Sequence, residues 1–421
     1  MKKYLFFIAV LFSVILPTCK QKNVAPATPD WQWRGKNRDG IYHETGLLQK
    51  WPAEGPELLW YFEGLGDGYT SVAIANEKLY VTGRDDDNLV LFVFDLNGRL
   101  FAKKIIGKEW DTNFEGPRCS VVVDDGKLYI GNSLGQLFCL DESTLAEIWK
   151  KDGLSDFDGR NIMFGMTENP LIVGDKIFMT PGGEKNNMVA LNKHTGELIW
   201  TSPGNGQLPA YCSPLYIGDQ QIPLVVTWLA STQRAERGIP NNNEFAAFHA
   251  ETGELVWAIT LPSDNTINPN TPLYDNGLIL ASTGYGGGSW LLLLKDGGRA
   301  VEQVWHNRAD NQHHGSVKVG DYLYTTGHAN RGFYCIDWKT GETKYRKEEQ
   351  SLSAMVFADG MLYCYDDRGG MSLIKPNPNE FESAGKFEIT LGTNQHWAHP
   401  VVYQGVLYIR HGDALMAYKV K

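Results

Sequence analysis

Short runs of apolar residues, separated by turns that often contain glycine, recur along the whole chain. The clearest unit is Ala190–Trp200, ALNKHTGELIW, in which an apolar run, a turn and a second run ending in tryptophan follow one another. The pattern returns at Ala247–Trp257 and Cys335–Tyr345, and without the turn glycine at Cys139–Trp149. Short apolar runs bounded by turn residues are typical of β-strands. The sequence therefore predicts a β-protein built from one repeated unit.

A second recurring signal adds further strands to each repeat. Asp-Gly, Gly-Asp or Asn-Gly turns are followed by apolar runs, as at Asp125–Asn132 and Gly320–Gly327, which is typical of β-hairpins. Each hairpin is followed by a third run and by a fourth that carries an aromatic residue, at intervals of roughly 40 to 57 residues, a period typical of propeller blades. These aromatic residues are Trp60, Phe101, Trp149, Trp200, Trp257, Trp305, Tyr345 and Phe387.

The order of these signals predicts how the ring closes. Trp60 precedes the first hairpin, whereas the last hairpin, around Leu407–Ile409, is followed only by Ala414–Lys419. We therefore expect an all-β fold: an eight-bladed propeller of four-stranded antiparallel blades, in which Leu58–Phe62 completes the last blade and protects its edge. The alternative is seven blades with an irregular insert at Ile222–Trp257 or Gly277–Trp305.

The N-terminus resembles that of an exported lipoprotein. Lys2 and Lys3 precede the apolar segment Tyr4–Leu16, which is too short for a membrane span. Leu16-Pro17-Thr18-Cys19 resembles a bacterial lipobox, so we expect residues 1–19 to be a signal peptide, Cys19 to be lipidated, residues 20–30 to be a tether and residues 31–421 to be the propeller. An ordinary cleaved signal peptide is the alternative. Lys20 is not the aspartate associated with inner-membrane retention, which favours an outer-membrane anchor facing the periplasm, with the cell surface as the alternative.

Charge and cysteine content narrow the choice of partners. The formal net charge is −10 and no basic stretch compensates it, which excludes general nucleic-acid binding. We expect a monomer that meets the membrane only through its lipid anchor. The remaining cysteines lie in apolar runs without a C-x-x-C motif, and their spacing does not indicate any particular disulfide. We therefore interpret them as small buried residues. They are Cys119, Cys139, Cys212, Cys335 and Cys364.

The A/C-x-D/N-x-x-T-G-x-x-x-W units and the opening Trp33-Arg34-Gly35…Asn37–Gly40 resemble the pyrroloquinoline-quinone-like (PQQ-like) β-propeller repeat proteins of the quinoprotein alcohol dehydrogenase-like superfamily. The resemblance covers residues 31–421, and the superfamily also includes the propeller lipoprotein of the outer-membrane protein assembly machinery. It implies a quinone cofactor and calcium, for which Glu168, Asn169 and Asn270 are candidate ligands. The chain lacks the adjacent cysteine pair and the C-x-x-C-H haem site of such enzymes. We therefore predict no cofactor and no metal, with a differently built PQQ or calcium site as the alternative.

A candidate site follows from the geometry of a propeller. The segments that enter the innermost strands gather at one mouth of the channel, and here they are rich in polar and aromatic residues, as ligand sites are. Gln312-His313-His314 and Gln395–His399 place four histidines at equivalent positions of two blades. Such imidazoles bind metals, transfer protons or satisfy turn backbone. Arg118 can meet an anionic ligand, or pair with Glu168 or a neighbouring aspartate. The predicted ligand-binding residues are Arg118, Glu168, Tyr211, Asn270, His313, His314, His396, Trp397 and His399.

Two classes of function are compatible with these features. The first is a non-catalytic binding or scaffold propeller whose partner is an envelope protein, a small molecule or a glycan. The second is an enzyme that uses the same mouth, either a quinoprotein-type oxidoreductase or a carbohydrate-active enzyme. The missing redox features favour the first class, and the sequence leaves open whether any catalysis occurs.

Overall fold

The structure is a computed structural model that describes residues 31–231, 243–263 and 265–421. The predicted signal peptide, Cys19 and the tether lie outside the described residues. Within the described ranges, no helix has the length and apolar character needed to cross a membrane.

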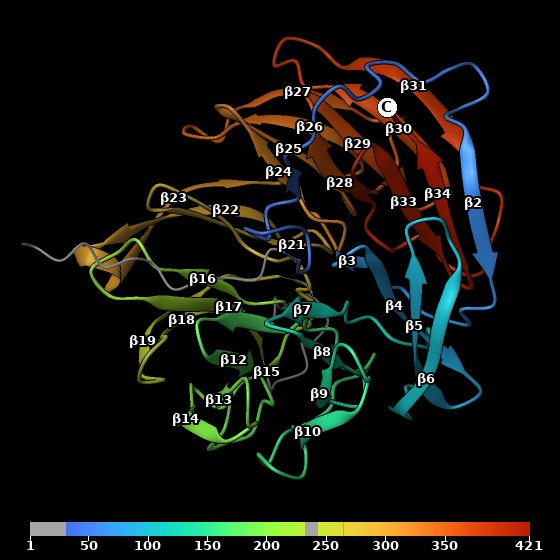
Figure 1. The fold of residues 1–421 in the computed structure, drawn as a ribbon. Coiled ribbons are helices and arrows are strands. Elements are labelled where there is room, and N and C mark those ends of the chain that lie inside the picture. Colours follow the sequence, from blue (N-terminus) through green and yellow to red (C-terminus); the bar gives the residue numbers. More distant parts are fainter. Residues whose placement is uncertain (1–30, 232–242, 264) are drawn as a thin grey trace, which may run out of the picture.

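Eight mainly antiparallel sheets are arranged around a central channel (Figure 1), and each forms one blade. The strands of a blade follow one another from the channel to the outer edge. Blades 1 to 4 comprise β3 (Ala73–Ala75), β4 (Lys78–Asp85), β5 (Asn88–Asp95) and β6 (Leu100–Lys108); β7 (Val122–Asp124), β8 (Lys127–Gly131), β9 (Gln136–Asp141) and β10 (Glu147–Asp152); β11 (Leu171–Val173), β12 (Lys176–Met179), β13 (Met188–Asn192) and β14 (Leu198–Ser202); and β16 (Leu215–Ile217), β17 (Leu224–Ala230), β18 (Glu244–His249) and β19 (Leu255–Thr260), with the short β15 (Leu208–Pro209) beside β17.

The second half of the chain continues the same order. Both segments that could have been irregular inserts form regular blades, so the prediction of eight blades is confirmed. Blades 5 to 8 comprise β20 (Leu273–Asp275), β21 (Leu278–Thr283), β22 (Gly288–Lys295) and β23 (Ala300–Asn307), with the 3-10 turn η1 (Asp296–Gly298); β24 (Val317–Val319), β25 (Tyr322–Gly327), β26 (Gly332–Asp337) and β27 (Thr343–Lys347); β28 (Ser353–Ala358), β29 (Met361–Asp366), β30 (Gly370–Lys375) and β31 (Glu382–Glu388), with β1 (Ile41–Tyr42) beside β28; and β32 (Val401–Tyr403), β33 (Val406–His411), β34 (Ala414–Lys419) and β2 (Leu58–Glu63).

The ring closes as predicted. The N-terminal strand β2 pairs antiparallel with the C-terminal strand β34, with Leu58 opposite Tyr418 and Glu63 opposite Ala414. In Figure 1, β2 is blue and lies beside the red strands of blade 8. The outer strand of this blade is therefore supplied by the other end of the chain, which gives the last sheet its fourth strand.

The tryptophans of the outer strands hold neighbouring blades together. The indole Nε1 of Trp200 donates a hydrogen bond to the carbonyl of Ala250, in the turn of the next blade, at 3.1 Å. The ring lies against Gly253, whose φ is +75° and where a Cβ would collide with Trp200. Trp60, Trp149, Trp257 and Trp305 donate to the next blade in the same way. The repeated Thr-Gly turn and the tryptophan are thus two halves of one contact between blades.

Phe101 departs from this scheme. In blade 2, Trp149 pairs with Cys139 immediately after a bulge in β10, and in blade 1 the residue that follows the equivalent bulge is Ala102, which pairs with Val93. The register of β6 therefore turns Phe101 outward, where 55% of it is exposed. The interpretation of Phe101 as a member of the aromatic series is wrong by one residue, because the bulge sets the register and cannot be read from the spacing.

The segment Trp31–Tyr42 forms a loop inside the channel. Trp31 bridges Val123, the middle residue of β7, and Ile41 pairs with Phe357, near the C-terminal end of β28. Between these two anchors the chain reaches the beginnings of the inner strands and returns. Both ends of the loop therefore lie farther from the mouth of the channel than its tip, and the tip lies beneath the mouth.

Two buried arginines fix the tip of this loop. Arg38 donates to the carbonyls of Asn169, Pro170 and Pro214, and Arg34 donates to the carbonyls of Ser316 and Met355. Burial lowers the pKa of each guanidinium to about 10, so both remain charged at neutral pH. Charged donors to backbone carbonyls form strong hydrogen bonds. The loop is therefore tied to blades 3, 4, 6 and 7.

The cores lie between the blades. Each apolar cluster combines residues of two neighbouring sheets, as where Tyr129 of β8 packs with Ile177 of β12. The five described cysteines are free and buried, in agreement with their interpretation as small core residues.

Candidate ligand-binding cavity at the channel mouth

A cavity of about 310 Å³ opens where the segments that enter the inner strands converge. We call it the mouth cavity. Seven of these eight segments contribute to its wall, and Trp33, near the tip of the channel loop, contributes to its lining. The cavity is lined by Trp33, Tyr69, Phe114, Arg118, Phe164, Thr167, Asn169, Tyr211, Ser213, Ile267, Pro269, Tyr285, Gln312, His313, Trp397 and His399.

Aromatic rings form a continuous belt around the mouth cavity. The ring of Trp397 lies 5.0 Å from that of Tyr69 and 4.9 Å from that of Phe114, measured between centroids. Phe114 contacts Phe164 at 5.8 Å, and Phe164 contacts Tyr211 at 6.3 Å. Rings at these separations pack against one another and offer flat apolar surfaces to a ligand.

Arg118 supplies a positive charge to the mouth cavity. Its guanidinium donates to the carbonyls of Asn113, Phe114 and Gly116 and lies 5.8 Å from the centre of the Tyr69 ring. Burial lowers the pKa of Arg118, and Glu109 is near enough to oppose this shift in part. No carboxylate lies within 4.0 Å of the guanidinium among the described residues, so the alternative of an ion pair with Glu168 or a neighbouring aspartate is wrong. The mouth cavity has no acidic side chain in its described lining. A half-buried guanidinium that forms no ion pair, in a cavity whose described lining has no acidic side chain, favours an anionic ligand.

His399 is held by the protein and forms a fixed part of the wall. Arg34 donates to its Nδ1 at 3.2 Å, and because arginine is always a donor, the imidazole proton lies on Nε2. That nitrogen donates to the carbonyl of His313 at 3.2 Å. Trp33 packs on the imidazole with ring centroids 4.4 Å apart. Burial and Arg34 keep the pKa of His399 well below its ordinary value, so its imidazole is neutral.

His313 and His314 carry polar atoms without partners. The rings stack at 3.9 Å, and His313 also meets the edge of Trp397 at 4.9 Å. Nε2 of His313 and both ring nitrogens of His314 have no hydrogen-bond partner among the described residues. Burial lowers the pKa of His313 to about 3 and that of His314 well below its usual value. Both imidazoles are neutral at physiological pH, which suits them to hydrogen bonding rather than to charge pairing.

A second cavity of about 430 Å³, which we call the side cavity, adjoins the mouth cavity. Gln312, His313 and Trp397 line both. The other residues that line the side cavity are mostly polar and come from blades 6 and 7. They are His314, His328, Arg331, Glu348, Glu349, Gln350, Ser351, Leu352, Asp367 and Arg368.

Three of the residues predicted from the sequence lie elsewhere. The Nδ2 of Asn270 donates to the carbonyls of Asn311 and Gln312, and its Oδ1 accepts from the amide of Gly315, so its side chain holds the loop that carries His313. His396 stacks on His411 at 3.6 Å, and its Nδ1 is 2.5 Å from the hydroxyl of Tyr365. Both side chains are occupied by contacts with the protein itself.

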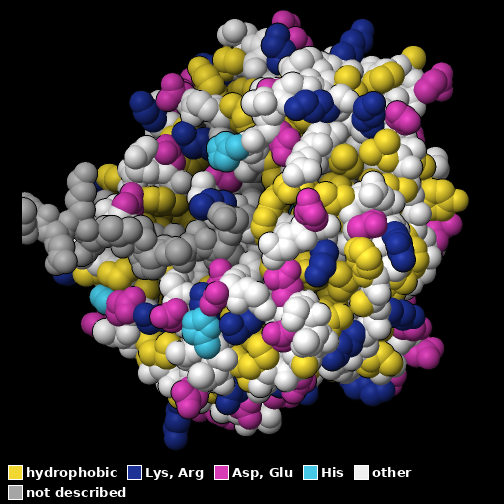
Figure 2. Space-filling model, in the orientation of Figure 1, with side chains coloured by type: hydrophobic (Ala, Val, Ile, Leu, Met, Phe, Trp, Pro, Cys, Tyr) yellow, Lys and Arg dark blue, Asp and Glu magenta, His cyan; other side chains and the backbone are white. Residues whose placement is uncertain are grey.

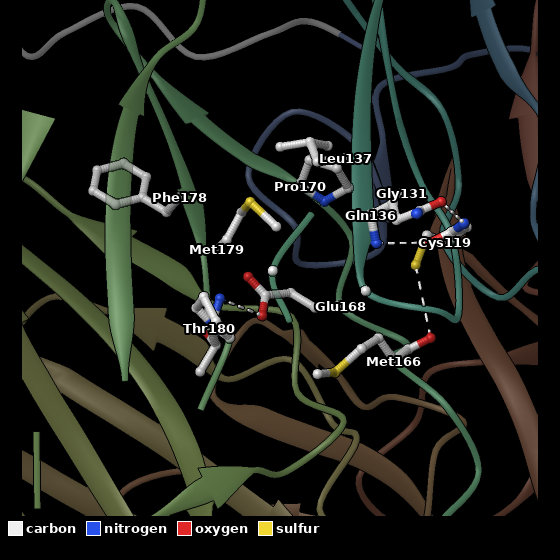
Figure 3. A pocket seen from close by; sticks show the side chains of 14 residues that line it. Cys119, Gly131, Gln136, Leu137, Met166, Glu168, Pro170, Phe178, Met179 and Thr180 are labelled. Atoms are coloured by element: carbon white, nitrogen blue, oxygen red, sulfur yellow. Dashed lines mark hydrogen bonds between the residues drawn. The ribbon is translucent and has the colours of Figure 1, made fainter. Parts of the chain in front are cut away.

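Glu168 points into a separate internal cavity of about 50 Å³ (Figure 3). One carboxylate oxygen accepts the backbone amide of Thr180 at 3.1 Å, and the other has no partner. Burial is the main cause that raises the pKa of Glu168 to about 8, and the nearby Arg38 only partly opposes it. This carboxyl group is therefore largely protonated at neutral pH and is not an anionic ligand in the mouth cavity.

The residues do not fit the calcium–quinone site that the family resemblance implies. Calcium needs six to eight oxygen ligands, among them carboxylates. Glu168 is turned into its own cavity, and the Asn270 amide is used by backbone groups. No group of three or more His, Cys, Asp or Glu side chains that could hold a metal occurs in the described ranges.

Much of the aromatic lining is absent from the residues that the sequence predicts for the site. Trp33 belongs to the opening motif alone, and the other aromatic residues that the prediction does not include are Tyr69, Phe114, Phe164 and Tyr285. Phe114 and Phe164 lie in the long loops β6–β7 and β10–β11. The unusual length of these loops is the signal that could have identified them, because long ordered loops often carry function.

The face seen in Figure 2 mixes acidic and basic side chains and shows no extended basic patch over its described residues. The fold and the cavities thus define an eight-bladed propeller with a loop in its channel and a candidate ligand site at one mouth.

Comparison with known proteins identifies the family of this propeller. The family model PQQ_2, described as outer membrane protein assembly factor BamB, matches residues 93–347, which is more than half of the chain. The chain belongs to this family. A curated outer membrane protein assembly factor BamB from Moranella endobia is 24% identical over 259 residues, which cover 58% of this chain and 61% of that protein.

Quinoprotein dehydrogenases are also relatives. A quinoprotein ethanol dehydrogenase from Pseudomonas putida is 24% identical over 290 residues, which cover 62% of this chain and 45% of that enzyme. The chain therefore matches less than half the length of this relative. BamB from Moraxella catarrhalis superimposes with a TM-score of 0.62 at 14% identity, covering 86% of this chain and 99% of that one. A quinohemoprotein alcohol dehydrogenase from Comamonas testosteroni gives 0.68 at 12% identity, covering 93% and 80%. These similarities establish the fold.

Proposed function

We propose that this chain is a non-catalytic binding propeller of the bacterial envelope, whose mouth cavity receives a small organic anion with a flat apolar face. The observation that carries the proposal is the position of Arg118, which forms no ion pair within 4.0 Å among the described residues and lies in a cavity otherwise lined by aromatic, aliphatic and neutral polar groups. Aromatic walls favour a flat apolar surface, and the unpaired guanidinium favours a carboxylate or a similar group.

The relatives support an envelope location. One of them is named an outer membrane protein assembly factor, and the N-terminal sequence resembles a lipobox. The proposal is therefore a monomer anchored through Cys19 at the outer membrane, facing the periplasm, with an envelope protein as a further partner. Labelling cells with a palmitate analogue tests the anchor: the wild-type chain should take up label and Cys19→Ala should not. Label in both would contradict the proposal.

Binding of 2-naphthoate, measured by isothermal titration calorimetry, tests the site. This molecule combines a flat apolar face with one carboxylate. We expect it to bind more tightly than the neutral 2-naphthamide, and we expect Arg118→Gln to weaken it about tenfold, the effect of one charge-assisted hydrogen bond. Arg299→Gln, an exposed arginine on blade 5, is the matched control. Equal binding of acid and amide would contradict the proposal.

The alternative function is a quinoprotein-type oxidoreductase, and the relatives from Pseudomonas putida favour it. Incubation with PQQ and Ca²⁺, followed by a dye-reduction assay with primary alcohols, separates the two functions. We expect no quinone-dependent reduction, because the carboxylates needed to hold calcium do not converge at the cavity. Turnover that requires both quinone and calcium would overturn the non-catalytic proposal.

A further inference from the structure

The mouth cavity and the side cavity lie next to each other and share part of their walls. Gln312, His313 and Trp397 line both, so these three side chains lie at the junction between a ligand in one cavity and its extension in the other. The two volumes, about 310 and about 430 Å³, are each within the range of small-ligand pockets. A ligand longer than a single ring can therefore occupy both.

The two parts differ in chemistry. The mouth cavity combines aromatic rings with the unpaired Arg118. The side cavity contains charges of both signs that are largely balanced within the protein: Arg331 and Arg368 act electrostatically on Asp367, which lines the same cavity, and Glu348 and Glu349 pair with Arg346 and Lys347. One end of the ligand should therefore be flat and anionic, and the other end should be uncharged and polar on all sides.

The neutral imidazoles at the junction indicate which polar groups the ligand carries. A neutral imidazole has one donor and one acceptor nitrogen, and a hydroxyl group can serve either. His314 is fully buried with both nitrogens unpartnered, and His313 offers Nε2. A buried polar atom without a partner costs free energy, which a ligand hydroxyl would remove. Several adjacent hydroxyls are a property of sugars.

We propose that the two cavities together bind an oligosaccharide that carries a uronate at one end. The uronate ring packs its C–H face on the aromatic belt and places its carboxylate towards Arg118, while the neutral sugars extend past His313 into the side cavity. This proposal rests on the proposed function and adds the class of ligand to it.

Three probes separate the contributions of the two cavities, each titrated into the purified chain by calorimetry. They are glucuronate linked to xylobiose, free glucuronate, which lacks the neutral part, and xylotriose, which lacks the anion. We expect the acidic trisaccharide to bind at least about tenfold more tightly than either of the others, because it alone makes both sets of contacts.

The side cavity is tested with the double variant Arg331→Gln/Arg368→Gln. Both residues are exposed, so the fold should persist, and the advantage of the trisaccharide over glucuronate should fall to less than about threefold. Binding of 2-naphthoate should be unchanged in this variant. The exposed pair Arg160→Gln/Arg299→Gln is the control.

Each result has a distinct meaning. If 2-naphthoate binds in an Arg118-dependent manner but the trisaccharide binds no more tightly than glucuronate, the saccharide proposal is wrong and the proposed function stands. If the double variant keeps the full advantage of the trisaccharide, the role of the side cavity is wrong. If neither 2-naphthoate nor any saccharide binds, the proposed function fails as well.

Discussion

The outer and inner edges of the blades follow different rules. At the outer edge, five tryptophans make the same hydrogen bond to the next blade. At the inner edge, each entering segment has a different sequence and contributes different side chains to the mouth cavity. Repetition specifies the architecture because every blade must pack on an equivalent neighbour, whereas a binding site must be irregular to recognise an irregular ligand.

The largest expected effect compares one tryptophan from each edge. Trp200→Ala removes a buried ring and its bond to Ala250, so the free energy of unfolding should fall by about 3–5 kcal/mol. Trp397→Ala, at the half-buried mouth, should cost about 1 kcal/mol or less but weaken 2-naphthoate binding about tenfold. Urea unfolding and calorimetry measure the two quantities. If Trp397→Ala instead lowered stability by several kcal/mol and Trp200→Ala instead weakened binding, the separate roles of the two edges would be refuted.

The protonation of Glu168 provides a pH-dependent test at the inner edge. Its pKa is about 8 in the folded chain and 4.5 ordinarily, so between these values the folded state holds a proton that the unfolded state has lost. The unfolding free energy should therefore fall as pH rises from 4.5 to 8, by up to about 1.4 kcal/mol per pH unit from this group.

Glu168→Gln should remove that contribution, so that the variant gains stability relative to wild type between pH 5 and pH 8.5. Urea unfolding at the two pH values measures it. Glu184→Gln, which changes an exposed carboxylate, is the control and should parallel the wild type. If the unfolding free energy of Glu168→Gln changed with pH in parallel with that of the wild type, this carboxyl group would not be held protonated in the folded chain.

A pair of glycines isolates the contact between tryptophan and turn. Gly253 and Gly277 both have positive φ, +75° and +84°, but a Cβ at Gly253 meets Trp200, whereas one at Gly277 has nothing within 4 Å. Gly277→Ala should cost about 1 kcal/mol through backbone conformation alone. Gly253→Ala should cost a further 1–2 kcal/mol or so from the collision. Equal shifts in urea midpoint would mean that the ring moves freely.

The smallest effect is expected at the surface of blade 1. Lys103 and Asp85 are 2.6 Å apart but roughly half exposed, so Lys103→Gln should change the unfolding free energy by less than about 0.5 kcal/mol. Urea unfolding of this variant also gives the smallest change in unfolding free energy that can be used to compare substitutions at the inner and outer edges. A loss above 1 kcal/mol would indicate a wider ion-pair network here.

The contrast between the edges also explains what could be predicted from sequence. The repeat spacing and the position of Trp60 were enough for eight blades and for closure by β2, because both depend on regular strand order. Of the proposed site residues, Arg118, Tyr211, His313, Trp397 and His399 line the mouth cavity.

The remaining site residues depend on loop conformation. Asn270 and His396 lie in the right segments but turn towards neighbouring protein groups, and Glu168 faces a separate cavity. Trp33 reaches the site from the N-terminal segment through the channel. No periodic pattern encodes such side-chain directions, since they follow from contacts between residues far apart in the chain.

The loop Trp31–Tyr42 affects how a ligand can enter and leave the molecule. Its buried arginines bind backbone carbonyls of blades 3, 4, 6 and 7 where the inner strands begin, so the loop occupies the channel beneath the mouth cavity. We therefore expect a ligand to enter and leave the cavity through the same opening. A macromolecule that docked over that opening would therefore slow the release of whatever lay beneath it, without touching the ligand itself.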